Sequence, residues 1–193
     1  ITVSHPFQQL LFSWLLLQLY QVFCLTSSRY PEFIKPGEVK IIIVPKINAK
    51  SEFILPRVDY NQLKLIEDEV KKLSTPFAKI SIINPVYEKV RISCHVHFKS
   101  TVGSGEFVAR LENDLRAFIC PWYDTPQSEI IFGGSIERSA LLTFIESLEY
   151  VTFVTRLSVV VLHYKNGDYS ISDSAAEDGK LNVLQSSTPW SVL

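Results

Sequence analysis

The sequence of 193 residues contains no methionine, three cysteines and seven glycines. The missing methionine and the first residue, Ile1, predict that this chain is part of a longer polypeptide. The cysteines Cys24, Cys94 and Cys120 are odd in number and widely spaced. This spacing fits neither a disulfide framework nor a zinc site, so we expect buried free thiols in a protein from a reducing compartment.

An excess of charge of either sign is also missing. The chain has 19 Lys and Arg against 20 Asp and Glu, which gives a net charge of −1. A nucleic-acid-binding protein normally has a basic stripe, so this balance argues against that class. A content of 47% hydrophobic residues predicts a globular protein with one sizeable core or two small ones.

Long uninterrupted hydrophobic runs are absent as well. The most apolar stretch, "LLFSWLLLQLYQVFCL" at residues 10–25, contains Ser13, Gln18 and Gln21 and has no basic flank. A membrane-spanning helix needs about 20 predominantly apolar residues. We therefore expect a buried helix over residues 6–18, followed by a strand over residues 20–25.

The rest of the chain alternates between helical and strand patterns. The clearest helix is expected at residues 59–73, where Asp59 and Gln62 fit a capping box. Its apolar face should consist of Leu63, Ile66, Val70 and Leu73. Further helices are expected at residues 105–119 and, after a Ser139 cap, at residues 140–150. Strands are expected at residues 38–46, 78–83, 89–99, 130–137, 151–164, 168–173 and 180–185.

This order of elements predicts an α+β protein. We expect two tandem, small α/β sandwich-like subdomains at residues 1–84 and 85–164. Each should have two helices packed on a short mixed or antiparallel sheet. Residues 165–193 should add a C-terminal hairpin and tail, because Asn166-Gly167 is a strong two-residue hairpin signal.

Candidate reactive groups are few. His95 and His97 share one face of the strand at residues 89–99, but no Cys, Asp or Glu on that strand completes a set of metal ligands. His5 and His163 are isolated in the sequence. We expect no catalytic residue, no cofactor and no metal, and hence no enzyme.

A glycine pair, Gly133-Gly134, precedes the helix expected from residue 140. A phosphate-binding loop places its glycines directly at the helix N-terminus and usually adds a lysine. Here the lysine is missing, and Glu137 would repel a phosphate. We therefore interpret Gly133 and Gly134 as structural glycines that mark a bulge or a close approach of the backbone.

Several blocks resemble the baseplate J-like family of contractile tails, in its C-terminal half. They are "IKPGEVKIIIVPK", "LPRVDYNQLKLIEDEVKKLSTPFAKISIINP", "PVYEKVRISCHVHFK", "LRAFICPW", "IFGGSIERSALLTFIESLEYVTFVTRLSVVV" and "SSTPWSVL". The resemblance implies a wedge component of the baseplate of a phage tail or a phage-tail-like contractile injection system. Such a component joins copies of itself and other wedge subunits in a ring around the hub, contacts the hub or proteins near the sheath, and holds the sheath extended until triggered. From the charge balance and the interrupted apolar stretch we also expect no nucleic-acid partner and no membrane span.

The resemblance leaves the kind of particle open. The protein would be cytoplasmic during assembly and then part of a particle that is virion-associated, docked at a membrane or released. Three loops that carry proline and aromatic residues suit contacts with neighbouring subunits. The interface residues that we expect from these loops are Trp122, Tyr123, Tyr30, Phe33 and Phe53.

Two alternatives from other classes stay open. One is a metal-dependent hydrolase that uses His95 and His97, for which stoichiometric metal in the purified protein would be the mark. The other is a small module that binds peptide or nucleic acid through its sheet, for which salt-dependent binding to oligonucleotides would be the mark.

Overall fold

The structure is a computed structural model, and it describes residues 19–46, 55–100, 104–124, 128–165, 168–175 and 181–193. The chain forms two compact units, Ile1–Pro85 (unit 1) and Val86–Leu193 (unit 2). The helix expected at residues 6–18 lies outside the described residues. The expected division into subdomains after residues 84 and 164 stays a prediction.

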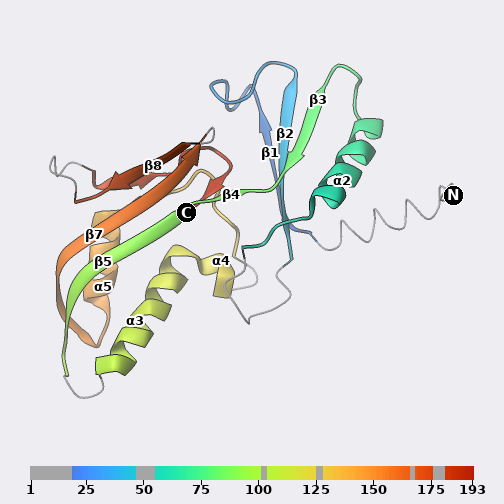
Figure 1. The fold of residues 1–193 in the computed structure, drawn as a ribbon. Helices are drawn as coiled ribbons and strands as arrows, with labels where there is room; N and C mark the ends of the chain where they lie inside the picture. The colour runs from blue at the N-terminus through green and yellow to red at the C-terminus, as the bar shows by residue number, and fades with distance from the viewer. Residues whose placement is uncertain (1–18, 47–54, 101–103, 125–127, 166–167, 176–180) are drawn as a thin grey trace. The chain divides into compact units, whose positions relative to one another are not determined.

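Unit 1 consists of a three-stranded sheet and one described helix (Figure 1). Strand β1 (Leu19–Thr26) pairs antiparallel with β2 (Glu38–Pro45). Strand β2 pairs in parallel with β3 (Lys79–Ile83), and helix α2 (Tyr60–Leu73) connects them. A parallel pair requires such a crossover connection, and a helix usually provides it.

The core of unit 1 follows from the β-branched run of β2 and from one face of α2. Ile43 of β2 and Ile66 of α2 are both at most 2% exposed. Asp59 caps α2 as expected, since its carboxylate accepts a hydrogen bond from the backbone N–H of Asn61 at 2.9 Å. The expected burial of Leu73 is wrong: its side chain is 83% exposed, because the helix ends there.

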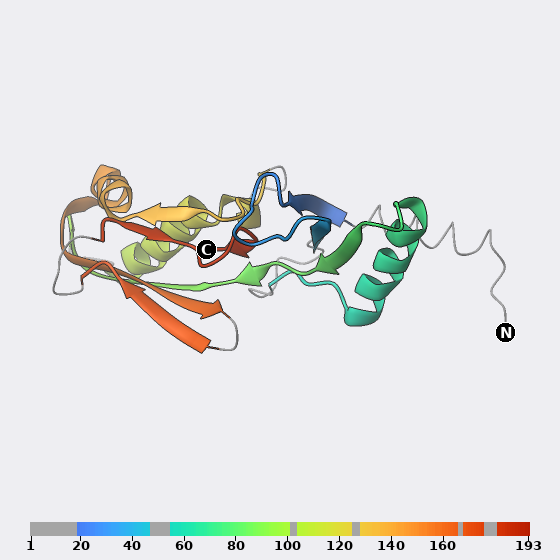
Figure 2. The same cartoon turned by 90° about the horizontal axis from the view of Figure 1, so that it is seen from above.

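Unit 2 is built on an antiparallel sheet with strand order β5-β7-β8. Helices α3 and α5, together with the two-stranded ribbon of β6 and β9, all lie on one side of this sheet (Figure 2). The elements are β5 (Lys89–Phe98), α3 (Ser104–Ile119), β6 (Ser135–Glu137), α5 (Arg138–Ser147), β7 (Val151–Lys165), β8 (Asp168–Asp173) and β9 (Val183–Gln185). Helices and sheets are thus segregated, and the expected α+β class is confirmed.

The alternating pattern of β5 has the predicted consequence. Val90, Ile92 and Val96 pack against the core that α5 shares with β7. In that core Leu141, Ile145 and Val159 are 0% exposed. Strands β7 and β8 form the expected hairpin, since Lys165 pairs with Asp168.

Two expectations about unit 2 are wrong at the level of single elements. Only Ser135–Glu137 of the strand expected at residues 130–137 forms β6, because the chain turns at Gly133. Ser139 lies inside α5 and does not cap it. Asn182 caps this helix instead, since its Oδ1 accepts from the Ser139 N–H at 3.1 Å and its Nδ2 donates to Ser139 Oγ at 2.9 Å.

The C-terminal segment closes unit 2 through a short pair of strands that the sequence pattern does not indicate. Strand β10 (Ser191–Val192) pairs in parallel with β4 (Val86–Tyr87). The N–H of Glu88 donates to the carbonyl of Val192 at 2.9 Å and extends this pairing to the start of β5.

The expectation of buried cysteines is wrong for Cys24, which is exposed on β1, whereas Cys94 and Cys120 are half-buried.

Candidate functional site

The residues expected at subunit contacts lie in both units. In unit 2, Trp122 belongs to the short helix α4 (Pro121–Asp124), is 5% exposed, and its ring lies 6.3 Å from that of Tyr87. The Tyr123 side chain is outside the described part of the chain. In unit 1, Tyr30 and Phe33 are half-buried, and Phe53 lies outside the described residues. The interface role of these five residues stays a prediction.

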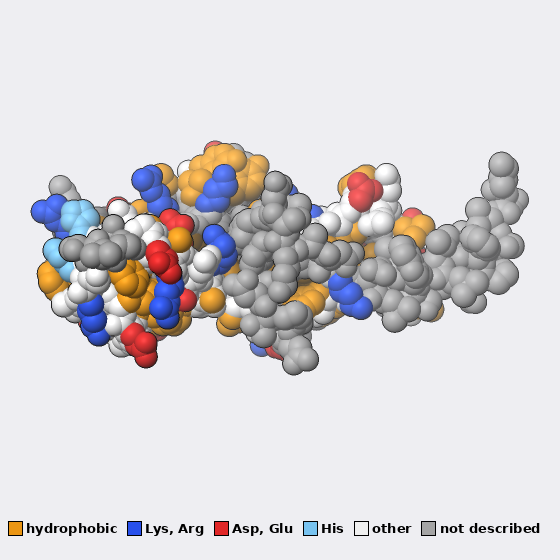
Figure 3. All heavy atoms as spheres, turned by 90° about the horizontal axis from the view of Figure 1, so that it is seen from below, with side chains coloured by type: hydrophobic (Ala, Val, Ile, Leu, Met, Phe, Trp, Pro, Cys, Tyr) orange, Lys and Arg blue, Asp and Glu red, His pale blue; other side chains and the backbone are white. Residues whose placement is uncertain are grey.

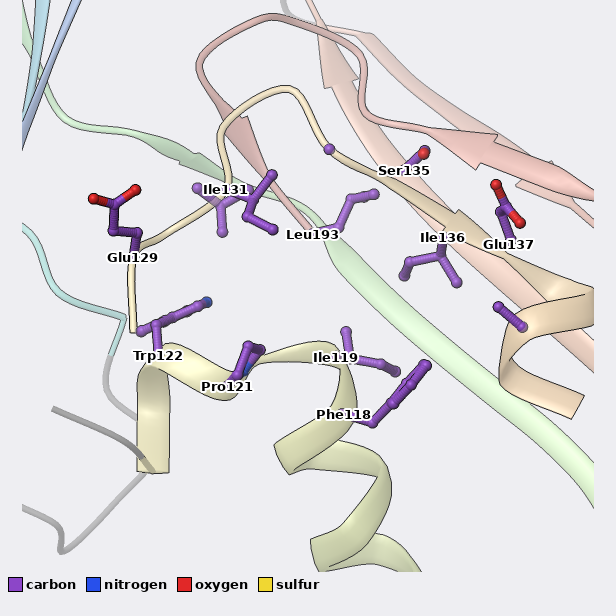
Figure 4. Close-up of a pocket in the computed structure, with 13 residues that line it drawn as sticks. Phe118, Ile119, Pro121, Trp122, Glu129, Ile131, Ser135, Ile136, Glu137 and Leu193 are labelled. Carbon is purple, nitrogen blue, oxygen red and sulfur yellow. The ribbon is translucent and has the colours of Figure 1, made fainter. Parts of the chain in front are cut away.

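Trp122 lines a groove in unit 2 with a volume of about 330 Å³. The groove runs between the end of α3, helix α4 and strand β6, and its apolar side chains converge on its centre (Figure 4). Its main apolar residues are Phe118, Ile119, Trp122, Ile131, Ile136 and Leu193. Phe118, near the end of α3, is 42% exposed and borders the groove, and its ring stacks on that of Phe144 with centroids 4.2 Å apart.

Among the described residues, the two ionisable side chains that line the groove are both acidic. Glu129 lies at one end of the groove and Glu137 at the other (Figure 4). Both side chains are exposed, and neither forms an ion pair with a residue in the described ranges. The groove is therefore an apolar channel with a negative charge at each end.

The glycine pair fixes the backbone at the rim of this groove. Gly133 has a φ of 65°, and a Cβ on it would lie 3.3 Å from Pro189 Cα. Left-handed φ and close backbone approach are the two conditions that glycine meets best. The Gly133 N–H donates to the carbonyl of Ser191 at 2.9 Å, which ties the turn to the C-terminal segment.

A buried polar cluster lies where the start of β5 meets β7. His163 and Glu88 are 6% and 7% exposed, and His163 Nδ1 lies 2.6 Å from Glu88 Oε2. Because an ionised carboxylate can only accept, Nδ1–H is the donor of this bond. His163 Nε2 lies 2.9 Å from Ser172 Oγ on β8. His163 is isolated in the sequence, but in the fold it has two polar partners, Glu88 and Ser172.

The second oxygen of Glu88 holds the C-terminal segment. Glu88 Oε1 accepts hydrogen bonds from the backbone N–H of Ser187 at 2.9 Å and from its hydroxyl. Burial opposes ionisation of Glu88, but hydrogen bonds from Ser187, Ser191 and His163 outweigh it and lower the pKa of this carboxyl below its usual value. The cluster thus stabilises an ionised carboxylate inside unit 2.

Ser172, His163 and Glu88 have the connectivity of a serine-hydrolase triad. A nucleophilic serine, however, is presented by a tight turn that exposes its hydroxyl. Ser172 instead lies within the paired part of β8, opposite Val161. We therefore assign this cluster to the stability of unit 2, where it joins β5, β7, β8 and the C-terminal segment.

His95 and His97 are both exposed on β5, as expected for solvated strand histidines. His97 stacks on Phe153 with ring centroids 4.0 Å apart. Within the described ranges, no three His, Cys, Asp or Glu side chains gather in a way that could hold a metal ion. The absence of a metal, a cofactor and an enzymatic activity stays a prediction.

The groove and the polar cluster were both missed by sequence reasoning. Glu88 and His163 are 75 residues apart, and Glu88 and Ser187 are 99 apart. The position of His163 could have predicted the cluster. His163 follows Val159 and Val161 on the face of β7 that is buried. A histidine in such a position requires a buried polar partner.

No helix among the described residues has both the length and the apolar character that a membrane span requires.

The fold of this chain is similar to that of a chain in a solved structure. That structure is described as "Cryo-EM structure of the anti-feeding prophage (AFP) baseplate, 6-fold symmetrised", and the match has a TM-score of 0.61 and 15% sequence identity. The match covers 99% of the present chain and 37% of the other, so the present chain spans little more than a third of that protein. At this identity the likeness establishes the fold alone. No curated protein matches the sequence.

The sequence itself identifies the family. The family model described as "Baseplate protein PVC11-like" matches residues 11–187, which include most of both units. The chain therefore belongs to the PVC11-like family of baseplate proteins.

Proposed function

We propose that this protein is a structural wedge subunit in the baseplate of a contractile phage tail or a phage-tail-like contractile injection system. The observation that carries the proposal is the match of residues 11–187 to PVC11-like baseplate proteins. In this role the protein joins copies of itself and other wedge subunits around the hub and holds the sheath extended until triggered. The likeness of fold to a chain of the AFP baseplate supports the same role. The narrower assignment to the baseplate J-like family belongs to this proposal.

The surface of unit 2 supports a role in assembly. The sheet face opposite the helices carries Phe153, Tyr164, Tyr169 and Ile171, whose side chains are 44%, 48%, 72% and 68% exposed. The rings of Tyr164 and Tyr169 lie 4.9 Å apart. Space-filling Figure 3 shows apolar side chains at the surface between charged ones. Tyr164, Tyr169 and Ile171 lie close together on β7 and β8, and clustered exposed apolar side chains are typical of protein–protein contact surfaces.

Such a subunit would be cytoplasmic while the particle assembles. It would then be part of a particle that is virion-associated, docked at a membrane or released. The function is carried by contact surfaces, and we assign it no reaction and no cofactor. Trp122, Tyr123, Tyr30, Phe33 and Phe53 remain our candidates for subunit contacts. For Trp122 the contact would be through the groove, because its side chain is otherwise buried.

The proposal is tested by locating the protein in purified particles. We expect an epitope tag on the full-length protein to bind gold-labelled antibody at the baseplate end of each particle in negative-stain electron micrographs. A tag on the sheath protein of the same particles serves as the control and should label the whole length. Gold along the sheath, or no label on intact particles that retain the tag, would contradict the proposed role.

A further inference from the structure

We infer that the groove of unit 2 binds an extended segment of a neighbouring baseplate protein, in which an apolar side chain is flanked by lysine or arginine. This inference rests on the proposed function and adds the chemistry of one contact to it. Three features of the groove carry it: its apolar floor, the free edge of β6, and its two terminal carboxylates.

The floor of the groove accepts an apolar side chain. Its volume of about 330 Å³ lies within the range of small-molecule pockets and is enough for one or two large side chains. Ile131 at its rim is 70% exposed, whereas Trp122 and Ile136 beneath it are 5% and 8% exposed. Covering Ile131 with an apolar group would remove this surface from water, which is the main favourable term in association.

The free edge of β6 favours an extended segment. Gly134 O accepts from Ser186 N–H at 3.0 Å, and Arg138 N–H donates to Asn182 O at 2.8 Å. Bonded and non-bonded pairs alternate in an antiparallel ribbon, so the backbone groups of Ser135 point away from β9. Among the described residues β6 pairs only with β9. An incoming strand can therefore add to this edge, which is a common way to bind a peptide.

The charges of the groove select the flanking residues of that segment. Glu129 and Glu137 lie at opposite ends of the groove (Figure 4), and no basic side chain among the described residues lines it. The basic residues nearest in sequence to these two glutamates have other partners. Arg116 Nη1 lies 3.5 Å from Asn113 Oδ1, and Arg138 Nε donates to Leu157 O at 2.9 Å. Complementary charges at the rim steer association and exclude the wrong partners, so an acidic segment is disfavoured.

Photo-crosslinking identifies the occupant directly. The full-length protein carries p-benzoylphenylalanine in place of Ile131, is assembled into particles, and is irradiated before mass spectrometry. We expect one major crosslinked peptide from another baseplate chain, with an aliphatic or aromatic residue between Lys or Arg residues. Crosslinks only within the same chain, or to a peptide without flanking basic residues, would overturn the inference.

Two kinds of variant test the same contact: one reverses the charges at the ends of the groove, and the other fills its volume. We expect incorporation into particles to fall about tenfold for the double reversal Glu129→Lys and Glu137→Lys, and similarly for Ala140→Trp, which fills the groove. The matched controls are Glu112→Lys with Glu146→Lys, and Ala109→Trp, at exposed helix positions that do not line the groove. Each control should incorporate within about twofold of the wild type.

The outcomes separate this inference from the proposed function. If the wild-type protein is absent from particles, the proposed function fails. If it is present and the groove variants, shown to be folded by circular dichroism, incorporate as well as their controls, only the inference about the groove fails.

Discussion

At the scale of single residues, Glu88 is the best example of a side chain whose role depends on the whole fold. Its carboxylate is bonded by His163 on one oxygen and by Ser187 on the other. An ionised group in a buried position is stable only when such partners surround it. The sequence around it, "VYEKV", predicts an ordinary glutamate at a strand start, because its partners lie 75 and 99 residues away.

We predict that Glu88→Gln lowers the free energy of unfolding at pH 7 by about 3 kcal/mol, as expected for a broken buried pair. The reason is that the amide cannot accept as strongly and leaves His163 with a weaker partner. Urea unfolding followed by circular dichroism measures this difference. Glu112→Gln at an exposed position of α3 is the control, with a change below about 0.5 kcal/mol.

The Glu88 carboxyl also determines how the stability of the protein changes at acidic pH. Its pKa is lowered in the folded protein, so the folded state binds fewer protons than the unfolded state. The stabilisation is fully present above the unfolded pKa of about 4.3, and is lost as the pH falls through the folded value. The difference in stability between wild type and Glu88→Gln should therefore shrink below about pH 4. A constant difference from pH 7 to pH 3 would contradict this assignment.

At the scale of elements, the sequence predicts most helices and strands because their side-chain periodicity is local. The alternation of Val90, Ile92 and Val96 marks β5, and the apolar face of α2 is correct up to its last residue. The errors arise where a distant segment decides. Asn182 replaces Ser139 as the cap of α5, and the turn at Gly133 shortens β6.

Helix α5 supplies two fully buried residues to the core of unit 2. Leu141 and Ile145 on its inner face are both 0% exposed, and they belong to the same core cluster as the buried residues of β7. We predict that Leu141→Ala destabilises the protein by about 3 kcal/mol, through lost burial and the cavity left behind. Thermal and urea unfolding check this value, with the exposed Glu146→Ala as control. A loss below about 1 kcal/mol for Leu141→Ala would mean that α5 is not anchored as described.

At the scale of the whole molecule, the α+β class follows from element order, but the groove does not. Its lining comes from the end of α3, from α4, from the turn before β6 and from the C-terminal Val192 and Leu193. Each of these segments looks in the sequence like a loop or an ordinary helix end. These segments form a groove only when they pack together in unit 2. Trp122, which we expected at a subunit contact, then lines the groove.

The central claim is that this protein acts through the surfaces it offers to other baseplate subunits. It is tested most directly by deleting the gene and counting particles with an extended sheath in electron micrographs. We predict that such particles are lost, and that the wild-type gene supplied in trans restores them. Extended, sheathed particles in normal number and shape without the protein would contradict the account.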